Sequence, residues 1–156
     1  MASGIPLCSE CKHVFDQIRR LKQHRYAIFV IENERRIRVE WLGARDSTYD
    51  EFLQDLCRAG PDQCRYAVFD FAYRQQYLGT SGSRLREKLF LMLWCPTQAQ
   101  IKDKMLYSST FWMLKQEFDG VGKCIQATEM EDIVRDKLEN ALFLEREESQ
   151  SAKADL

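Results

Sequence analysis

The sequence predicts a mixed α/β (α+β) fold, in which one sheet of five to six strands is flanked by helices on both faces. Three observations lead to this prediction. Apolar residues recur at strand spacing in some segments and at helix spacing in others, and the two kinds of segment alternate along the chain. The 156 residues include 45% apolar and 30% charged residues, which suits one soluble domain. No repeat or low-complexity linker divides them. We therefore expect one domain over residues 1–145 and a polar, disordered tail over 146–156.

The first half of the chain predicts two helices around a hairpin. In order, we expect a helix over 9–22, strands over 26–32 and 36–42, and a helix over 48–58. Ser9 is expected to cap the first helix, and Ser47 or Thr48 the second, because small hydroxyl side chains accept bonds from the first backbone N–H groups. A tight polar turn at 33–35 joins the two strands.

The second half predicts a longer hairpin, a long helix, a short strand and a last helix. The expected ranges are strands over 64–73 and 88–95, a helix over 97–118, a strand over 123–127 and a helix from 129 to about 145. The two hairpin strands are almost continuously apolar, which favours central strands covered on both faces. A long loop over 74–85 is expected between them. Consecutive hydroxyl residues at 108–110 predict a bend in the long helix.

Charge and cysteine usage exclude several classes of protein. The formal net charge of −1 excludes a simple electrostatic nucleic-acid binder. It conceals a division, because residues 1–110 carry 17 basic and 13 acidic groups, whereas residues 111–156 carry 6 and 11. No apolar run suits a membrane span or a secretory signal, so the cytosol is the expected compartment. There the six cysteines should be free thiols, namely Cys8, Cys11, Cys57, Cys64, Cys95 and Cys124.

No pattern predicts catalysis. His13 and His24 have no serine, cysteine or carboxylate in a triad context. Cys8 and Cys11 form a CxxC sequence, but neither a preceding strand nor a second ligand pair for zinc is predicted there. No phosphate-binding glycine motif occurs. We expect no enzyme activity, no cofactor and no metal; a thiol-dependent enzyme, the alternative, would need a strongly acidified cysteine.

The segment over 101–118 predicts a binding surface instead. It combines the cations Lys102, Lys104 and Lys115 with large apolar side chains, and these apolar residues cover more than one helical stripe. Some of them should therefore reach the surface. An exposed apolar patch beside lysines is typical of a site that recognises a protein partner.

The segment over 101–118 resembles the corresponding segment of the actin-depolymerising factor/cofilin family, and the resemblance extends over roughly residues 1–143. The closest likeness is to insect cofilins of the twinstar type, with departures that indicate a divergent paralogue. The matching pieces are MASG at 1–4, HRYAIFVI at 24–31, YDEFLQDL at 49–56, CRYAVFDF at 64–71, KLFLMLWCP at 88–96, IKDKMLYSS at 101–109 and IQATEM at 125–130. The resemblance implies the cofilin-like fold. It also implies a monomeric, non-enzymatic protein that binds actin monomers and filaments and promotes filament depolymerisation and severing.

The resemblance also implies site residues. The monomer-binding surface would comprise Ala2, Ser3, Gly4, Ile5, Lys102, Lys104, Met105, Leu106 and Ser109. The filament surface would use Arg86, Lys88 and Arg146. Ser3 matches the family's regulatory phosphorylation site, so a kinase and a phosphatase are expected partners. Phosphoinositides are further expected ligands, through Lys102, Lys104 and Lys115.

Several residues depart from the family pattern, on the long helix and on the filament surface. Gln116 and Glu117 stand where basic residues are common, and Trp112 replaces an acidic residue. Ala141 and Leu144 stand where cations are expected. These departures predict retained monomer binding with weakened filament binding and severing. The alternative is a monomer-binding or lipid-binding adaptor of the same fold with weak or no severing. We expect the cytoplasmic actin cytoskeleton as the location, with the nucleus second.

Overall fold

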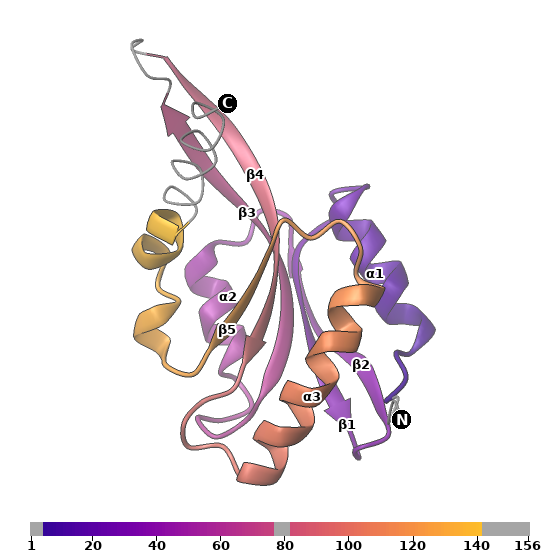
Figure 1. Cartoon of the computed structure of the whole chain (residues 1–156). Helices are drawn as coiled ribbons and strands as arrows, with labels where there is room; N and C mark the ends of the chain where they lie inside the picture. Colours follow the sequence, from indigo (N-terminus) through magenta and orange to yellow (C-terminus); the bar gives the residue numbers. More distant parts are fainter. Residues whose placement is uncertain (1–4, 77–81, 142–156) are drawn as a thin grey trace, which may run out of the picture.

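The computed structural model describes residues 5–76 and 82–141, which fold around one five-stranded sheet (Figure 1). The strand order is β2-β1-β3-β4-β5; β4 and β5 are parallel, and the other neighbours are antiparallel. The strands are β1 His24–Glu32, β2 Arg36–Ala44, β3 Arg65–Gln76, β4 Ser83–Trp94 and β5 Lys123–Ala127. The helices are α1 Ser9–Arg19, α2 Tyr49–Leu56 and α3 Ile101–Glu117, followed by the 3₁₀ turn η1 Met130–Asp132 and by helical residues 135–141. The mixed sheet confirms the predicted fold class.

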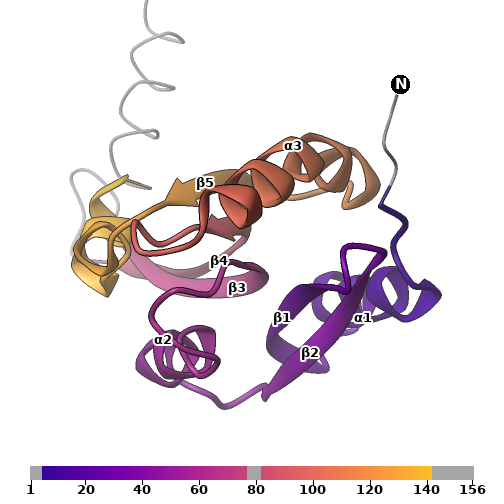
Figure 2. The ribbon, with the colours of Figure 1, turned by 90° about the horizontal axis from the view of Figure 1, so that it is seen from below.

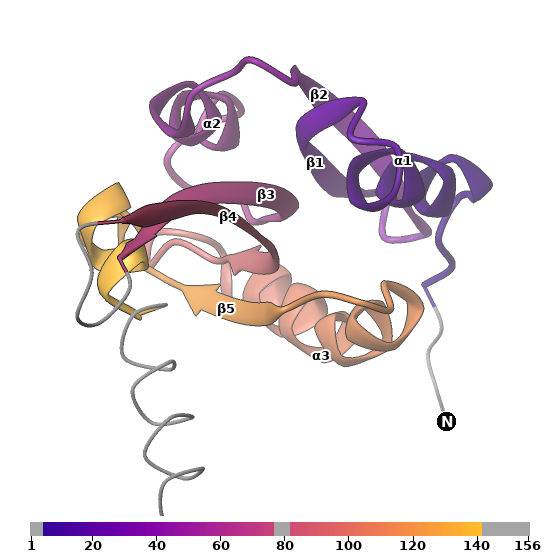
Figure 3. The same cartoon turned by 90° about the horizontal axis from the view of Figure 1, so that it is seen from above.

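Helices cover both faces of the sheet, as the sequence predicts. Helices α1 and α3 share one apolar cluster, in which the Phe15 and Phe118 rings stack with centroids 4.6 Å apart. Helix α2 and residues 135–141 contribute Phe52 and Leu138 to a second cluster on the opposite face. Figures 2 and 3 show α2 and α3 on opposite sides of the β3–β4 pair. The sheet therefore separates two cores.

Strands β3 and β4 are the central strands, and their continuous apolar character reflects burial on both faces. Residues 65–71 and 90–94 are all buried. Successive side chains point to opposite faces of a strand. Accordingly Leu91 lies in the cluster with α1 and α3, whereas Met92 lies in the cluster with α2. This confirms the prediction of central strands.

The predicted loop over 74–85 is wrong at both of its ends. Strand β3 continues to Gln76 and β4 begins at Ser83, and Gln75 pairs with Arg84 in the ladder. The hairpin formed by these strand ends extends beyond the helices (Figure 1). None of the described helices covers it there, so its residues need no apolar alternation. For this reason the strand ends have a composition typical of loops, and the sequence does not reveal them as strands.

Local signals at the first elements are partly confirmed. Thr48 caps α2, because its Oγ1 accepts a bond from the Glu51 N–H at 3.2 Å. The tight turn at 33–35 is present, with Asn33 and Glu34 in the left-handed region. The cap of α1 is Cys8 and not Ser9. These helices also end early, at Arg19 and Leu56, where the sequence predicts continuation to 22 and 58.

Predictions for the later helices need three corrections. Helix α3 begins at Ile101 rather than at 97. It is one uninterrupted α-helix to Glu117, so the hydroxyl residues at 108–110 do not recap the chain. The last helix does not begin at 129, because residues 130–132 form the 3₁₀ turn and regular helix starts only at 135. Residues 142–156, including the predicted tail, lie outside the described residues. Within the described residues, no helix is long and apolar enough to cross a bilayer.

Candidate functional site

Helix α3 carries a row of exposed apolar side chains opposite its buried face. Its buried residues are Tyr107, Thr110, Phe111 and Leu114. Ile101, Met105 and Trp112 are 74%, 69% and 65% exposed. Residues three, four, seven and eleven apart lie on the same side of an α-helix, so these three side chains form one row, the α3 row. Packing of the buried face in the core therefore holds α3 in place, with the α3 row facing solvent.

Two lysines flank the α3 row. Lys102 and Lys104 are two residues apart and so project from opposite flanks of the helix. The exposed Lys102 Nζ pairs with a Glu34 carboxylate oxygen at 2.5 Å. The half-buried Lys104 donates from Nζ to the Thr97 carbonyl at 2.7 Å. The arrangement is an apolar row between two cations, which suits a partner with an apolar cleft edged by acidic groups.

The Glu34 contact sets the electrostatics of Lys102. The hydrogen bond to the Glu34 carboxylate, with its negative charge, raises the pKa of the Lys102 ammonium above its ordinary value. Lys102 is therefore fully charged at neutral pH. Solvent screens an exposed ion pair of this kind, so a partner's carboxylate can readily replace Glu34.

The remaining monomer-surface residues differ in their surroundings. Leu106 is half-buried against the core, whereas Ser109 is exposed and donates its hydroxyl to the Leu106 carbonyl at 3.1 Å. Ile5 is buried in the core cluster, so its side chain anchors the N-terminal segment. Residues 2–4, which include Ser3, lie outside the described residues.

A second basic region lies on the hairpin. Arg84, Arg86 and Lys88 alternate along β4 and so project from one face, the same face as Met92 and the helical residues 135–141. We call these three cations the hairpin row. Arg86 is exposed and Lys88 is half-buried. Figure 1 shows the hairpin and the start of α3 at opposite ends of the molecule. The predicted filament residue Arg146 lies outside the described residues.

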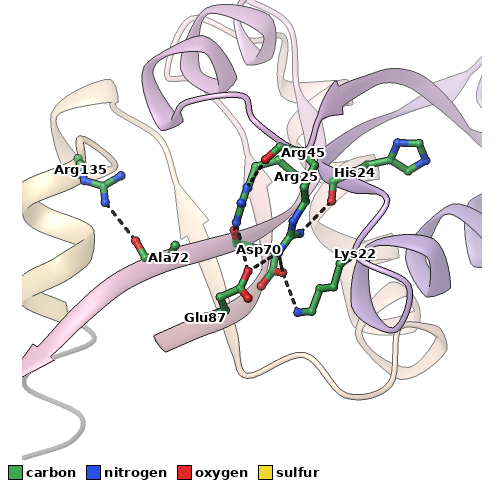
Figure 4. A network of polar contacts seen from close by, with 8 residues as sticks. All are labelled: Lys22, His24, Arg25, Arg45, Asp70, Ala72, Glu87 and Arg135. Carbon is green, nitrogen blue, oxygen red and sulfur yellow. Dashed lines mark hydrogen bonds and ion pairs between the residues drawn. The ribbon is translucent and has the colours of Figure 1, made fainter. Parts of the chain in front are cut away.

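The base of the hairpin is held by a polar network, the hairpin anchor, on the face opposite the hairpin row. Figure 4 shows Lys22, Arg25 and Arg45 converging on Asp70 and Glu87. Asp70 Oδ2 lies 2.8 Å from Lys22 Nζ and 2.9 Å from Arg45 Nη2. Arg25 donates to the Asp70 carbonyl at 3.0 Å, and both arginines pair with Glu87. The anchor ties β3 and β4 to the strands and turns that precede them.

Asp70 is charged although it is almost fully buried. Burial alone would raise its pKa, but the ion pairs with Lys22 and Arg45 outweigh this effect and lower the pKa below 3.8. Lys22 reaches Asp70 from a left-handed backbone conformation with φ of 55°. This conformation ends the first helix region before 22, because it cannot belong to a right-handed helix.

The described residues do not form an evident catalytic or metal centre. Burial raises the pKa of the Cys11, Cys57, Cys64 and Cys124 thiols, which is opposite to the change a nucleophilic thiol needs. His13 and His24 both contact Gln17. Within residues 5–76 and 82–141, no group of three or more metal-ligating side chains occurs.

Three residues of these surfaces escape the sequence-based site prediction. Ile101 and Trp112 belong to the α3 row, and their helical spacing from Met105 is the signal that identifies them. Arg84 falls in a predicted loop, where strand alternation with Arg86 and Lys88 is not apparent. Once the strand is known, the i, i+2, i+4 spacing places the three cations on one face.

A surface helix with an apolar row between lysines, on a five-stranded mixed sheet with a projecting basic hairpin, defines a protein-binding module. Comparison with known proteins identifies its class. Residues 4–142 match the family model described as Cofilin/tropomyosin-type actin-binding protein. The chain belongs to this family, the actin-depolymerising factor/cofilin family of actin-binding proteins, which is not a family of enzymes.

Individual relatives agree with this assignment. The chain is 34% identical over 133 residues to Actin-depolymerizing factor 11 of Oryza sativa subsp. japonica, covering 85% of this chain and 86% of the relative. It is 33% identical to Actin-depolymerizing factor of Lilium longiflorum, covering 91% and 97%. Among solved structures, Streptomyces griseoflavus cofilin superposes with a TM-score of 0.73 at 30% identity, covering 86% and 93%. The Caenorhabditis elegans ADF-like UNC-60A protein gives 0.74 at 26% identity, covering 91% and 96%.

Proposed function

We propose that this chain binds actin monomers and filaments and promotes filament depolymerisation. The observation that carries the proposal is the α3 row: three large apolar side chains remain exposed on a helix whose other face is packed in the core, in a member of an actin-binding family. Exposed apolar rows between cations cost solubility unless a partner covers them. The row is therefore the natural centre of the monomer interface.

Each part of the α3 surface has a distinct role in the proposed complex. Met105, at the centre of the row, enters an apolar cleft on actin, where its removal from water supplies most of the affinity. Lys102 and Lys104 pair with acidic groups at the margin of that cleft and mainly fix orientation and speed association. Leu106, Ser109 and the N-terminal residues 2–4 complete the proposed surface, and Ile5, whose side chain is buried in the core, anchors that segment.

Filament depolymerisation follows from binding two conformations unequally. A ligand shifts an equilibrium only by the difference between its affinities for the two states. Contact through both α3 and the hairpin row would favour one arrangement of adjacent actin subunits over another, and so loosen the filament. Arg86, Lys88 and Arg146 are the proposed filament residues, and Arg84 extends them.

Severing is the part of the function that we propose to be weakened. Gln116 and Glu117 end α3 without the family's usual cations, and Glu117 instead pairs with Lys12 at 3.4 Å. Ala141, half-buried on the last helix, cannot supply a charge to the filament; Leu144 stands at another position where the family has a cation. A filament surface with fewer cations should bind more weakly. The alternative function is an adaptor that binds monomers or lipids and severs little or not at all.

Regulation is proposed at both ends of the monomer surface. Phosphorylation of Ser3 by a kinase would add about −1.5 to −2 charges to a surface that needs positive potential to attract actin's acidic groups, and a phosphatase would reverse it. Phosphoinositides would compete with actin for Lys102, Lys104 and Lys115. The proposed setting is a monomeric protein of the cytoplasmic actin cytoskeleton, with the nucleus as a second location.

The test is monomer binding by a charge-removal pair. Labelled actin monomers are titrated with the wild type, with Lys102→Ala/Lys104→Ala and with the matched control Arg20→Ala/Arg58→Ala, which removes two exposed cations outside α3 and the hairpin. The α3 pair should lose at least about tenfold in affinity, and the control pair less than about twofold. Unchanged affinity in the α3 pair would refute the proposed monomer surface. Co-sedimentation with filaments at near-neutral and alkaline pH, together with a pyrene-actin assembly assay, then tests severing. Strong pelleting with rapid severing would refute its weakening.

A further inference from the structure

Two pairs of cysteines bring their sulfur atoms into contact, and the pairs differ in accessibility. Cys8 Sγ lies 3.3 Å from Cys11 Sγ, and Cys64 Sγ lies 3.1 Å from Cys95 Sγ. All four are free thiols. Cys64 and Cys95 are only 2% and 7% exposed, whereas Cys8 is half-buried and reaches solvent. Only the first pair offers a sulfur to a reagent in solution.

Cys8 stands at the N-terminal end of α1, as the predicted helix start at 9 implies, and no strand precedes it within the described residues. It is the N-cap of α1, and the preceding Leu7 forms a parallel bridge with Ile37 of β2. A short extended segment leading into a helix that opens with CxxC is the arrangement in which thiols exchange with disulfides.

Cys11 is suited to the second step of such an exchange. It is fully buried in the first turn of α1, and its thiol donates to the Ile37 carbonyl at 3.3 Å. Burial, together with the Cys8 contact, raises the pKa of the Cys11 thiol. Such a thiol does not attack an external reagent readily, but it needs to reach only the adjacent sulfur of Cys8. The two cysteines therefore divide into an accessible and a resolving thiol.

We propose that Cys8 and Cys11 form a redox-active dithiol, which low-molecular-weight disulfides such as glutathione disulfide oxidise to an intramolecular disulfide while Cys64 and Cys95 stay reduced. None of these cysteines is among the residues proposed for either actin surface, so the thiol chemistry is tested without actin.

The exchange proceeds in two steps. The Cys8 thiolate attacks one sulfur of glutathione disulfide, so that a mixed disulfide forms and glutathione thiolate leaves. The Cys11 sulfur then attacks Cys8 Sγ, its proton passes to the leaving glutathione sulfur, and the second glutathione departs as a thiol. Two protein thiols are thereby oxidised and one glutathione disulfide is reduced to two glutathione molecules. The Cys8 N–H still donates to the Ile37 carbonyl at 2.9 Å, so a backbone bond that holds the segment to β2 does not depend on the thiols.

Tryptic mapping of the full-length protein tests the proposal. The folded, reduced protein is treated with glutathione disulfide, quenched with acid, alkylated with N-ethylmaleimide in denaturant and digested. Cys8 and Cys11 share the tryptic peptide over 1–12, whereas Cys64 and Cys95 fall in separate peptides over 59–65 and 89–102. The expected result is a 1–12 peptide that has lost both alkylation sites and two hydrogens. It should form at least about tenfold faster than any cross-link between the other two peptides.

Single substitutions separate the roles of the two thiols. Cys11→Ser should stop the reaction at the glutathione adduct of Cys8, whereas Cys8→Ser should leave Cys11 reduced. Cys124→Ser, which removes an exposed unpaired thiol, should leave the 1–12 disulfide unchanged. A 1–12 peptide that keeps both alkylation sites while Cys124 is glutathionylated would overturn the proposal. Equal or faster cross-linking of Cys64 to Cys95 would overturn it as well. Circular dichroism before quenching shows that each variant is folded.

Discussion

The α3 surface and the hairpin surface are both basic, but they are held in place by different forces. The α3 row stands on a helix whose opposite face is buried among Tyr107, Phe111 and Leu114. The hairpin row lies where β3 and β4 leave the core, and the charged side chains of the hairpin anchor hold its base. Apolar packing changes little with pH or salt, whereas ion pairs respond to both. The position of the α3 row should therefore be insensitive to pH and salt, whereas the position of the hairpin row should depend on both.

The largest expected effect comes from a charge placed at the centre of the α3 row. Met105→Asp should weaken binding to actin monomers by at least about 100-fold, because a buried, unpaired carboxylate would replace an apolar anchor. The side chain is exposed in the free protein, so the free energy of unfolding should change by less than about 0.5 kcal/mol. Monomer titration and urea unfolding measure the two effects.

The matched control for Met105→Asp places the same charge on the hairpin. Leu85 is 60% exposed on β4, and Leu85→Asp should leave monomer affinity within about twofold. If both substitutions weaken monomer binding equally, the two surfaces are not separate. A large loss of stability in Met105→Asp would instead show that the row belongs to the core.

Removing cations from the hairpin row should affect filaments and spare monomers. Arg84→Ala/Arg86→Ala should reduce co-sedimentation affinity for filaments by about tenfold, because each charged contact with an acidic surface contributes to attraction and orientation. Monomer affinity should stay within about twofold. The pair Arg20→Ala/Arg58→Ala is the control for net charge. Equal loss of monomer and filament binding would contradict the separation of the surfaces.

The hairpin anchor should make stability depend on acid pH. The folded-state pKa of Asp70 lies below its ordinary value of 3.8. The stabilisation is therefore fully present above that value and is lost as the pH falls through the folded-state pKa. Asp70→Asn should cost about 1–2 kcal/mol at pH 7, less than a fully buried pair, because Lys22 and Arg45 are partly exposed.

Urea unfolding at several pH values measures the contribution of Asp70. The difference between wild type and Asp70→Asn should shrink steadily below pH 3.8. Asp119→Asn, at an exposed position after α3, should show no such trend. A difference that is the same at neutral and strongly acid pH would mean that the substitution acts through packing and not through charge.

The sequence predicts the central fold well because burial on two faces leaves a continuous apolar signal in β3 and β4. It does not predict the outer ends of the hairpin strands, over which the described residues place no layer. Nor does it predict the end of α1 at Arg19, after which Lys22 adopts a left-handed conformation in its contact with Asp70, 48 residues away. The lysines of α3 are predictable as cations beside apolar residues. The pairing of Lys102 with Glu34 is not, because the β1–β2 turn reaches α3 only in the folded chain.

The smallest expected effect concerns the far end of the α3 row and tests how far the monomer interface extends. Trp112 lies two helical turns beyond Met105, about 10 Å along the axis, at a position where an acidic residue is expected from the family resemblance. Trp112→Ala should weaken monomer binding by about threefold, because a peripheral aromatic contributes less than a central anchor.

The comparison for Trp112→Ala is Trp41→Ala, which removes an exposed indole from β2, the edge strand farthest from β5, and should not alter affinity. Unchanged binding in Trp112→Ala would show that the monomer interface does not reach the second half of α3. A loss as large as that of Met105→Asp would instead show that the centre of the interface lies closer to Trp112. In either case, the result at Trp112, where this chain departs from the family pattern, shows how far the monomer interface extends along α3.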